Sequence, residues 1–124
     1  MRRSASSIAH DSHNLIVAGT NDADMVLAGN TVRKNKGGLA FALNGQVVGE
    51  LPLPVAGLMS TESAESVEEK LQALKAALKA HGISEDIDAF MTLAFVSLPV
   101  IPKLRLNTYG IVDVDAQRIV PAVF

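Results

Sequence analysis

The pair Asn44-Gly45 is the feature that most restricts how this chain of 124 residues folds. It lies between two strand-like runs, residues 39–43 and 46–51. A two-residue turn between adjacent strands needs positive φ at both central positions, which asparagine and glycine tolerate best. The sequence therefore predicts a β-hairpin here. All five residues of 39–43 are apolar, which indicates a strand buried on both faces.

The segment 60–81 is the clearest helix in the sequence. Its apolar positions recur at alternating spacings of three and four, which gives one stripe: Ala64, Val67, Leu71, Leu74 and Leu78. Acidic residues stand at its start and basic residues at its end, as the helix dipole favours, and Gly82 ends it. The other face is charged, so this helix is expected to lie on a surface.

The other segments carry weaker signals. Residues 15–18 predict a buried strand. A helix follows, with Asn21 or Thr20 as its cap and Asp22 and Asp24 at its positive end. An ordinary helix cap is favoured there over an anion site, because two aspartates repel phosphate. Residues 1–14 predict a loop or an entering extended segment.

The second half of the chain leaves one choice open. Residues 52–59 are apolar and irregular, because two prolines prevent regular pairing, and they are expected to pack on something. Residues 89–98 are apolar at nearly every position, so strand and helix both fit. Short strands are predicted at 111–114 and 119–123, after a turn at 107–110. Together these elements predict an α/β or α+β domain, a mixed β-sheet with helices packed on it in two layers.

Composition excludes several classes of protein. The net charge is −2, aromatic residues make up 4% of the chain, and basic residues form no stripe, which argues against nucleic-acid binding. No apolar run is long enough for a membrane span. The N-terminus lacks the apolar core of a signal peptide. Cysteine is absent, which excludes disulfides and fits a cytoplasmic protein.

The stretch IAHDSHN, residues 8–14, is the candidate functional segment. It holds two of the three histidines of the chain, His10 and His13, with Asp11 between them. A catalytic zinc site needs three protein ligands, and only Asp11 is at hand as the third. A histidine beside a carboxylate also suits proton transfer near neutral pH. The third reading is a polar turn before a strand, and the residues alone leave all three open.

Several longer strings of the chain resemble one family. They are SSIAHDSHN, IVAGTNDADM, the GG before a strand, ELPLPVAGLMS, FMTLAFVSLPVIPKLRL and YGIVDV. Together they are similar to the C-terminal domain of bacterial adenine deaminase, a member of the amidohydrolase superfamily. The likeness runs from about residue 3 to residue 114 and does not rest on a motif of two or three letters.

The resemblance implies a metal-dependent hydrolase that converts adenine and water to hypoxanthine and ammonia in purine salvage. A binuclear manganese or iron centre activates the water in such enzymes. That centre lies in a (β/α)₈ barrel, with an H-x-H pair that this sequence lacks. We therefore expect no metal site and no cofactor in this chain. The expected partners are the catalytic barrel, adenine and further copies of the protein.

The resemblance also suggests roles for the candidate segment. His10, Asp11 and His13 are candidates to contact substrate or to orient a residue that holds the metal, and Ser12 and Asn14 are candidates for substrate binding. A structural role that ties the domain to the barrel is an equal alternative. By itself the chain is expected to be inactive, and to support the barrel, close its site or make subunit contacts.

Two other readings stay open. One is a stand-alone purine-binding module with a ligand pocket near residues 10–14, and the other is a small enzyme that uses His10, Asp11 and His13. The family's domain begins upstream of the segment matched here, so 1–124 is expected to be a domain truncated at its N-terminus. A missing strand would leave an open sheet edge, so the isolated chain is expected to associate.

Overall fold

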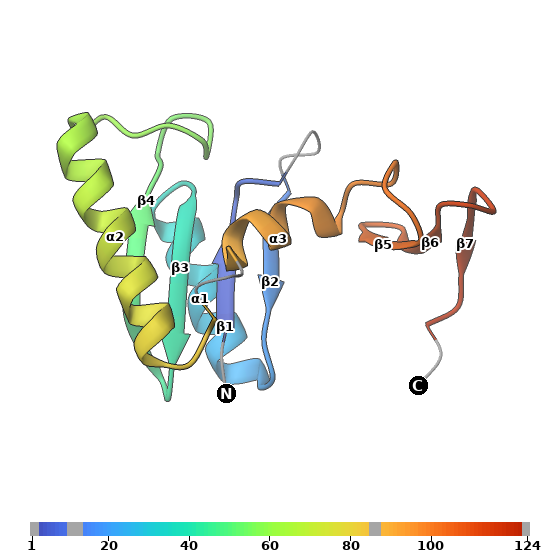
Figure 1. Cartoon of the computed structure of the whole chain (residues 1–124), viewed down its shortest axis with the longest axis horizontal. Helices are drawn as coiled ribbons and strands as arrows, with labels where there is room; N and C mark the ends of the chain where they lie inside the picture. The colour runs from blue at the N-terminus through green and yellow to red at the C-terminus, as the bar shows by residue number, and fades with distance from the viewer. Residues whose placement is uncertain (1–2, 10–13, 85–87, 123–124) are drawn as a thin grey trace.

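The computed structural model describes residues 3–9, 14–84 and 88–122. In these residues the strands are β1 (Arg3–Ser6), β2 (Ile16–Ala18), β3 (Gly38–Leu43), β4 (Gln46–Pro52), β5 (Leu104–Asn107), β6 (Gly110–Asp113) and β7 (Arg118–Val120). The helices are α1 (Asp22–Lys34), α2 (Ala64–Ala80) and α3 (Ala89–Val96). Figure 1 shows a body built on β1–β4 and the three helices, and a separate three-stranded sheet that we call the arm, residues 104–120. No helix of the described residues is long and apolar enough to cross a membrane.

The main sheet has the strand order β2-β1-β3-β4. The predicted hairpin is confirmed: Leu43 pairs with Gln46, and the turn residues Asn44 and Gly45 have φ of 54° and 76°. The α+β class is confirmed as well. The expectation of a mixed sheet is wrong, since every strand pairing in the described residues is antiparallel.

Strand β1 occupies the centre of the sheet, although the sequence predicted only a loop or an extended segment there. It pairs with β2 on one side and with β3 on the other. Ser4, Ala5 and Ser6 are all buried. Small and hydroxyl-bearing residues give no alternating apolar signal, so the pattern of β1 resembles that of a polar loop.

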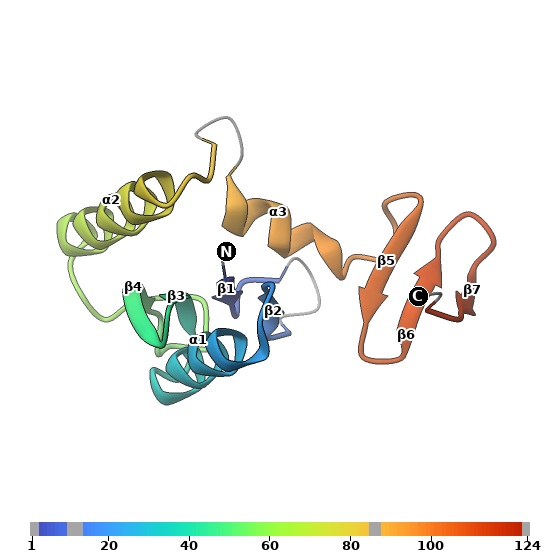
Figure 2. The ribbon, with the colours of Figure 1, turned by 90° about the horizontal axis from the view of Figure 1, so that it is seen from below.

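Helices cover both faces of the sheet, as Figure 2 shows, so the predicted two layers are in fact three. Ala40 and Ala42 of β3 face α1 in a cluster with Ala5, Ala28 and Val32. The alternate residues of β3 face α2 and α3 in a second cluster: Leu39, Phe41, Leu51, Leu53, Leu74, Leu78 and Phe90. The apolar run of β3 thus has a cover on each side, as its composition predicted.

Each helix begins at a side-chain cap. Asn21 caps α1, and its Oδ1 accepts a hydrogen bond of 2.9 Å from the Asp24 N–H. Ser63 caps α2, which covers most of the predicted segment 60–81. Asp88 caps α3 and accepts from the N–H groups of Phe90 and Met91. The apolar stretch 89–98, left open between strand and helix, is therefore mainly helical.

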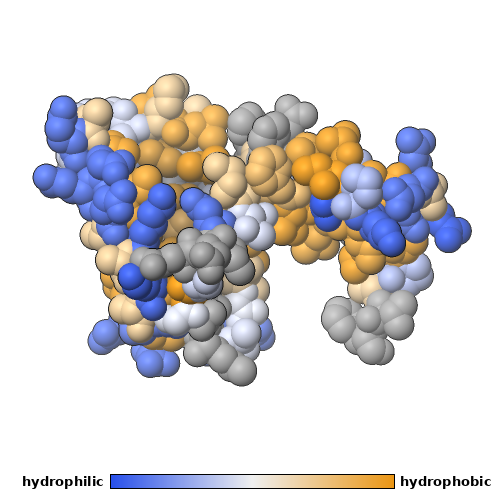
Figure 3. Space-filling model, in the orientation of Figure 1, coloured by the Kyte–Doolittle hydropathy of each residue, from blue (hydrophilic) through white to orange (hydrophobic). Residues whose placement is uncertain are grey.

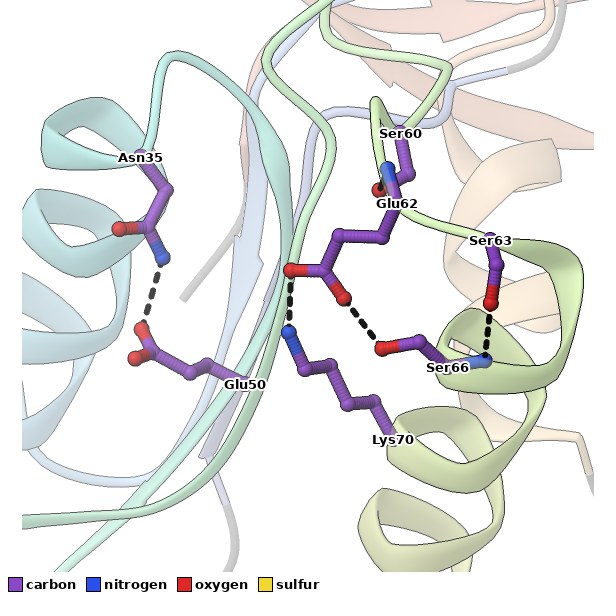
Figure 4. Close-up of polar contacts among 7 residues, drawn as sticks. All are labelled: Asn35, Glu50, Ser60, Glu62, Ser63, Ser66 and Lys70. Carbon is purple, nitrogen blue, oxygen red and sulfur yellow. Dashed lines mark hydrogen bonds and ion pairs between the residues drawn. The ribbon is translucent and has the colours of Figure 1, made fainter.

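A polar network surrounds the start of α2 (Figure 4). The Ser66 hydroxyl donates a hydrogen bond of 2.6 Å to Glu62, and Lys70 forms an ion pair with the same carboxylate. The hydrogen bond from Lys70 and then that from Ser66 lower the pKa of Glu62 below its ordinary value. The backbone N–H of Glu65 and the Ser63 hydroxyl likewise lower the pKa of Glu65.

The arm is a meander in which β6 pairs with β5 and with β7. Its last two strands lie close to the predicted ones, and β5 was not predicted. An Asx turn joins β5 to β6, with Asn107 Oδ1 accepting from the Tyr109 N–H at 2.8 Å. In Figures 1 and 2 the arm extends from the end of α3, away from the main sheet.

Candidate functional site

The candidate segment joins β1 to β2, two antiparallel neighbours in the sheet. His10, Asp11, Ser12 and His13 lie outside the described residues. Asn14 is described: it is half-buried and lies two residues before the first residue of β2. The two ends of the segment can therefore be examined, and both emerge from the central sheet.

The first end is anchored by two serines. The buried Ser6 hydroxyl accepts a hydrogen bond of 3.0 Å from the Ile8 N–H. The Ser7 hydroxyl accepts a hydrogen bond of 2.7 Å from the Gly38 N–H and donates one of 2.5 Å to the Gly57 carbonyl. Ala9, the last described residue before His10, is 1% exposed. The chain therefore leaves β1 along a path that hydrogen bonds and burial hold in place.

Two glycines bring a second loop against this anchor. A Cβ at Gly37 would lie 2.2 Å from the Gly57 Cα, a distance that no side chain tolerates. Gly37 also has φ of 128°, which favours glycine. The Leu53 N–H donates to the Gly37 carbonyl at 3.1 Å. Leu53 and Gly57 are thus packed backbone to backbone against the turn that follows α1.

The loop 53–59 divides its apolar side chains between the core and the surface. Leu53 is buried in the cluster beneath α2. Val55 and Met59 form a bridge through hydrogen bonds of 3.0 and 3.1 Å, and their side chains are 40% and 58% exposed. The expectation that this segment packs on something is met by Leu53 and the glycine contact, while Val55 and Met59 face solvent.

Asp24 has a role that the sequence did not reveal. We expected a charge at the positive end of a helix, but its side chain is 2% exposed. Its carboxylate accepts hydrogen bonds from the Asn44 and Gly45 N–H groups at 3.0 and 2.7 Å. This aspartate holds the hairpin against α1. A carboxylate in the first turn of a helix looks the same in sequence whether it faces water or the core.

His81, the third histidine, ends α2 as expected. Its ring centroid lies 5.8 Å from that of Phe41, so it packs on the core cluster. Within residues 3–9, 14–84 and 88–122, no group of three or more histidine, aspartate or glutamate side chains is placed to hold a metal ion.

A cavity of about 440 Å³ lies between α2 and α3. Its apolar lining includes Leu78, Ile83 and Phe90. Lys75 and Asp88 also line it, with the Lys75 Nζ 3.9 Å from the Asp88 Oδ2. No residue of the Ser7 anchor lines it.

Comparison with known proteins decides the family. The sequence model of one protein family, the adenine deaminase C-terminal domain, matches residues 4–118. The chain belongs to this family. It is 50% identical over 117 residues to adenine deaminase 2 of Carboxydothermus hydrogenoformans, and 56% identical over 110 residues to the adenine deaminase of Kosmotoga olearia. It is 44% identical over 117 residues to the enzyme of Bacillus velezensis.

These matches cover 89% to 94% of the chain but only 19% to 20% of each relative. The chain thus corresponds to the C-terminal fifth of an adenine deaminase. The matched residues include most of the body and the arm as far as the first residue of β7. The resemblance inferred from the sequence is confirmed.

Proposed function

We propose that this chain serves as the C-terminal domain of an adenine deaminase, a hydrolase that converts adenine and water to hypoxanthine and ammonia. The observation that carries the proposal is the match over residues 4–118, together with 44% to 56% identity to adenine deaminases. We further propose a cytoplasmic role in purine salvage and a homo-oligomeric holoenzyme. The domain 1–124 would work beside the catalytic barrel and be inactive alone.

The metal chemistry would come from the rest of the protein. A binuclear manganese or iron centre supplies an activated water when bound. The described residues offer no set of ligands for such a centre. The contribution of this chain would therefore be to shape and close the site.

Residues 10–14 are the part of the chain that we propose reaches the site. His10, Asp11 and His13 would contact adenine or orient a metal-holding residue, and Ser12 and Asn14 would bind substrate. The support is the anchor at Ser6, Ser7 and the buried Ala9, since a functional loop needs rigid ends to hold its side chains in position.

The test is a hybrid in which this chain replaces the C-terminal fifth of the Carboxydothermus relative. Ammonia release from adenine is measured in the hybrid and in its His10→Ala and His13→Ala variants, with metal content measured in parallel. We expect at least a tenfold lower kcat at unchanged metal content, in the range that loss of one acid–base group costs. Unchanged kcat in both variants would leave the segment a structural role.

A titration of the isolated chain with adenine tests the alternative that it is a stand-alone purine-binding module. The cavity between α2 and α3 is one described space that a purine could enter, so the variant that tests it is Phe90→Ala. We expect no binding at millimolar adenine. Saturable binding that Phe90→Ala removes would instead support a purine-binding module.

A further inference from the structure

The arm has no buried residue. In the described residues after Leu98, namely 99–122, every side chain is exposed or half-buried. Both apolar clusters of the structure lie in the body. A sheet of three strands that are three or four residues long is marginal in water unless one face is covered. The arm therefore needs a surface outside itself.

The strand register shows which face is bare. In antiparallel pairs, residues directly opposite each other share one face of the sheet. One row consists of Leu106, Ile111 and Val120, and the next of Leu104, Asp113 and Arg118. Leu104 and Leu106 are 56% and 54% exposed. This face, which we call the leucine face, is apolar with one acid and one base side by side.

The opposite face is already partly occupied. Arg105, Val112 and Ile119 lie there, and of these Ile119 is 58% exposed. The Arg105 guanidinium donates to the Pro102 carbonyl at 2.8 Å, and Val112 lines a hollow with Pro99 and Val100 of the segment that leads into the arm. In Figure 3 apolar surface runs from α3 towards the arm. On the leucine face, Leu104 and Leu106 both stay more than half exposed.

We propose that the leucine face docks on the catalytic part of the same polypeptide, the four fifths of an adenine deaminase that precede this domain. The choice of partner rests on the proposed function. The partner surface would be apolar, with a charged pair opposite Asp113 and Arg118.

Area favours this partner over a second copy. Strands spaced by about 4.8 Å, with a rise of about 3.4 Å per residue, give a face of roughly 200 Å². A stable complex between separate proteins buries about 800 Å² on each side. Within one polypeptide a small contact suffices, because the linker holds the effective concentration near the millimolar range. The family model also reaches residue 118, so the arm belongs to the domain shared with relatives five times longer.

Hydrogen exchange of residues 104–120 tests the proposal. It is measured in the isolated chain at two concentrations and in the hybrid with the Carboxydothermus relative. We expect exchange at least tenfold slower in the hybrid, and we expect Leu104→Asp with Leu106→Asp to abolish that slowing. The controls are Val26→Asp and Met91→Asp, exposed positions on α1 and α3, which should leave the slowing intact.

A photo-crosslinking residue at Leu106 gives a second readout that needs no destabilised variant. We expect crosslinks to peptides of the relative's preceding four fifths. Equal exchange in both proteins, or crosslinks confined to the body, would overturn the proposal. Slowing that is already present in the isolated chain and grows with concentration would assign the face to a second copy instead.

Deaminase activity separates the two proposals. A hybrid that deaminates adenine with an unprotected arm would defeat the docking alone. A protected arm in an inactive hybrid would defeat the proposed function alone.

Discussion

The carboxylate of Asp24 accepts a hydrogen bond of 2.7 Å from the backbone N–H of Gly45, 21 residues along the chain. The same group accepts 3.0 Å from the Asn44 N–H. One buried side chain of α1 thus satisfies two donors of the hairpin that joins β3 to β4. Hydrogen bonds to a charged acceptor are about twice as strong as neutral ones.

We expect Asp24→Ala to lower the free energy of unfolding by about 2 to 4 kcal/mol, because it leaves two backbone donors without this acceptor. Urea unfolding measures the change. Asp22→Ala is the matched control on the exposed side of the same turn and should cost no more than about 1 kcal/mol. Equal losses in the two variants would mean that the hairpin contact adds nothing.

Gly37→Ala should be among the most destabilising single changes. A Cβ there would meet the Gly57 Cα at 2.2 Å, and φ of 128° strains any other residue. We expect a loss of about 3 kcal/mol or more, of the size seen for overpacking with backbone strain.

The control for that change is Gly29→Ala in the interior of α1. Its Cβ would meet only the Val17 side chain, at 3.4 Å. We expect a neutral effect or a gain of up to about 1 kcal/mol, since alanine favours helix over glycine. Thermal unfolding of both variants decides; a tolerated Gly37→Ala would refute the close packing of loop 53–59.

Ser7→Ala removes the hydroxyl that joins the Gly38 N–H to the Gly57 carbonyl. We expect a loss of about 1 to 3 kcal/mol, because a partly buried donor and acceptor lose their partner. Hydrogen exchange at 55–59 should accelerate more than exchange in α1. Ser66→Ala, on the exposed start of α2, should leave exchange at 55–59 unchanged; acceleration there in both variants would argue against a local latch.

Acid should weaken the start of α2. The pKa of Glu62 and that of Glu65 are lowered in the folded protein, from an ordinary value of 4.5. Folding then favours the ionised form, so the stabilisation is present above that value and is lost as the pH falls below it. Glu62→Gln should therefore reduce the drop in urea midpoint between pH 7 and about pH 3.5.

Glu69→Gln on the same helix is the control. Its urea midpoint should fall more between pH 7 and about pH 3.5 than that of Glu62→Gln. Both carboxylates of the network are exposed, so the effect is small and shrinks with salt. A Glu62→Gln protein with the full acid loss would show that the Lys70 pair has no influence on stability.

Local sequence determined much of this protein. Asn44-Gly45 predicted the hairpin because the positive φ angles of its turn depend only on the two residues that occupy it. The apolar stripe from Val67 to Leu78 predicted α2, because helical periodicity is visible within a single segment of sequence. The long strings shared with adenine deaminases identified the family without any coordinates.

Tertiary structure decided what depends on residues distant in the chain. The small, hydroxyl-bearing β1 became the central strand because β2 and β3 pair with its two edges. Ser7 became an anchor through partners 31 and 50 residues away. The Asp24 side chain is buried because its carboxylate accepts hydrogen bonds from the N–H groups of the hairpin turn. A residue's type states which bonds it can form, but only the packing of distant segments selects the partner and keeps water from competing for it.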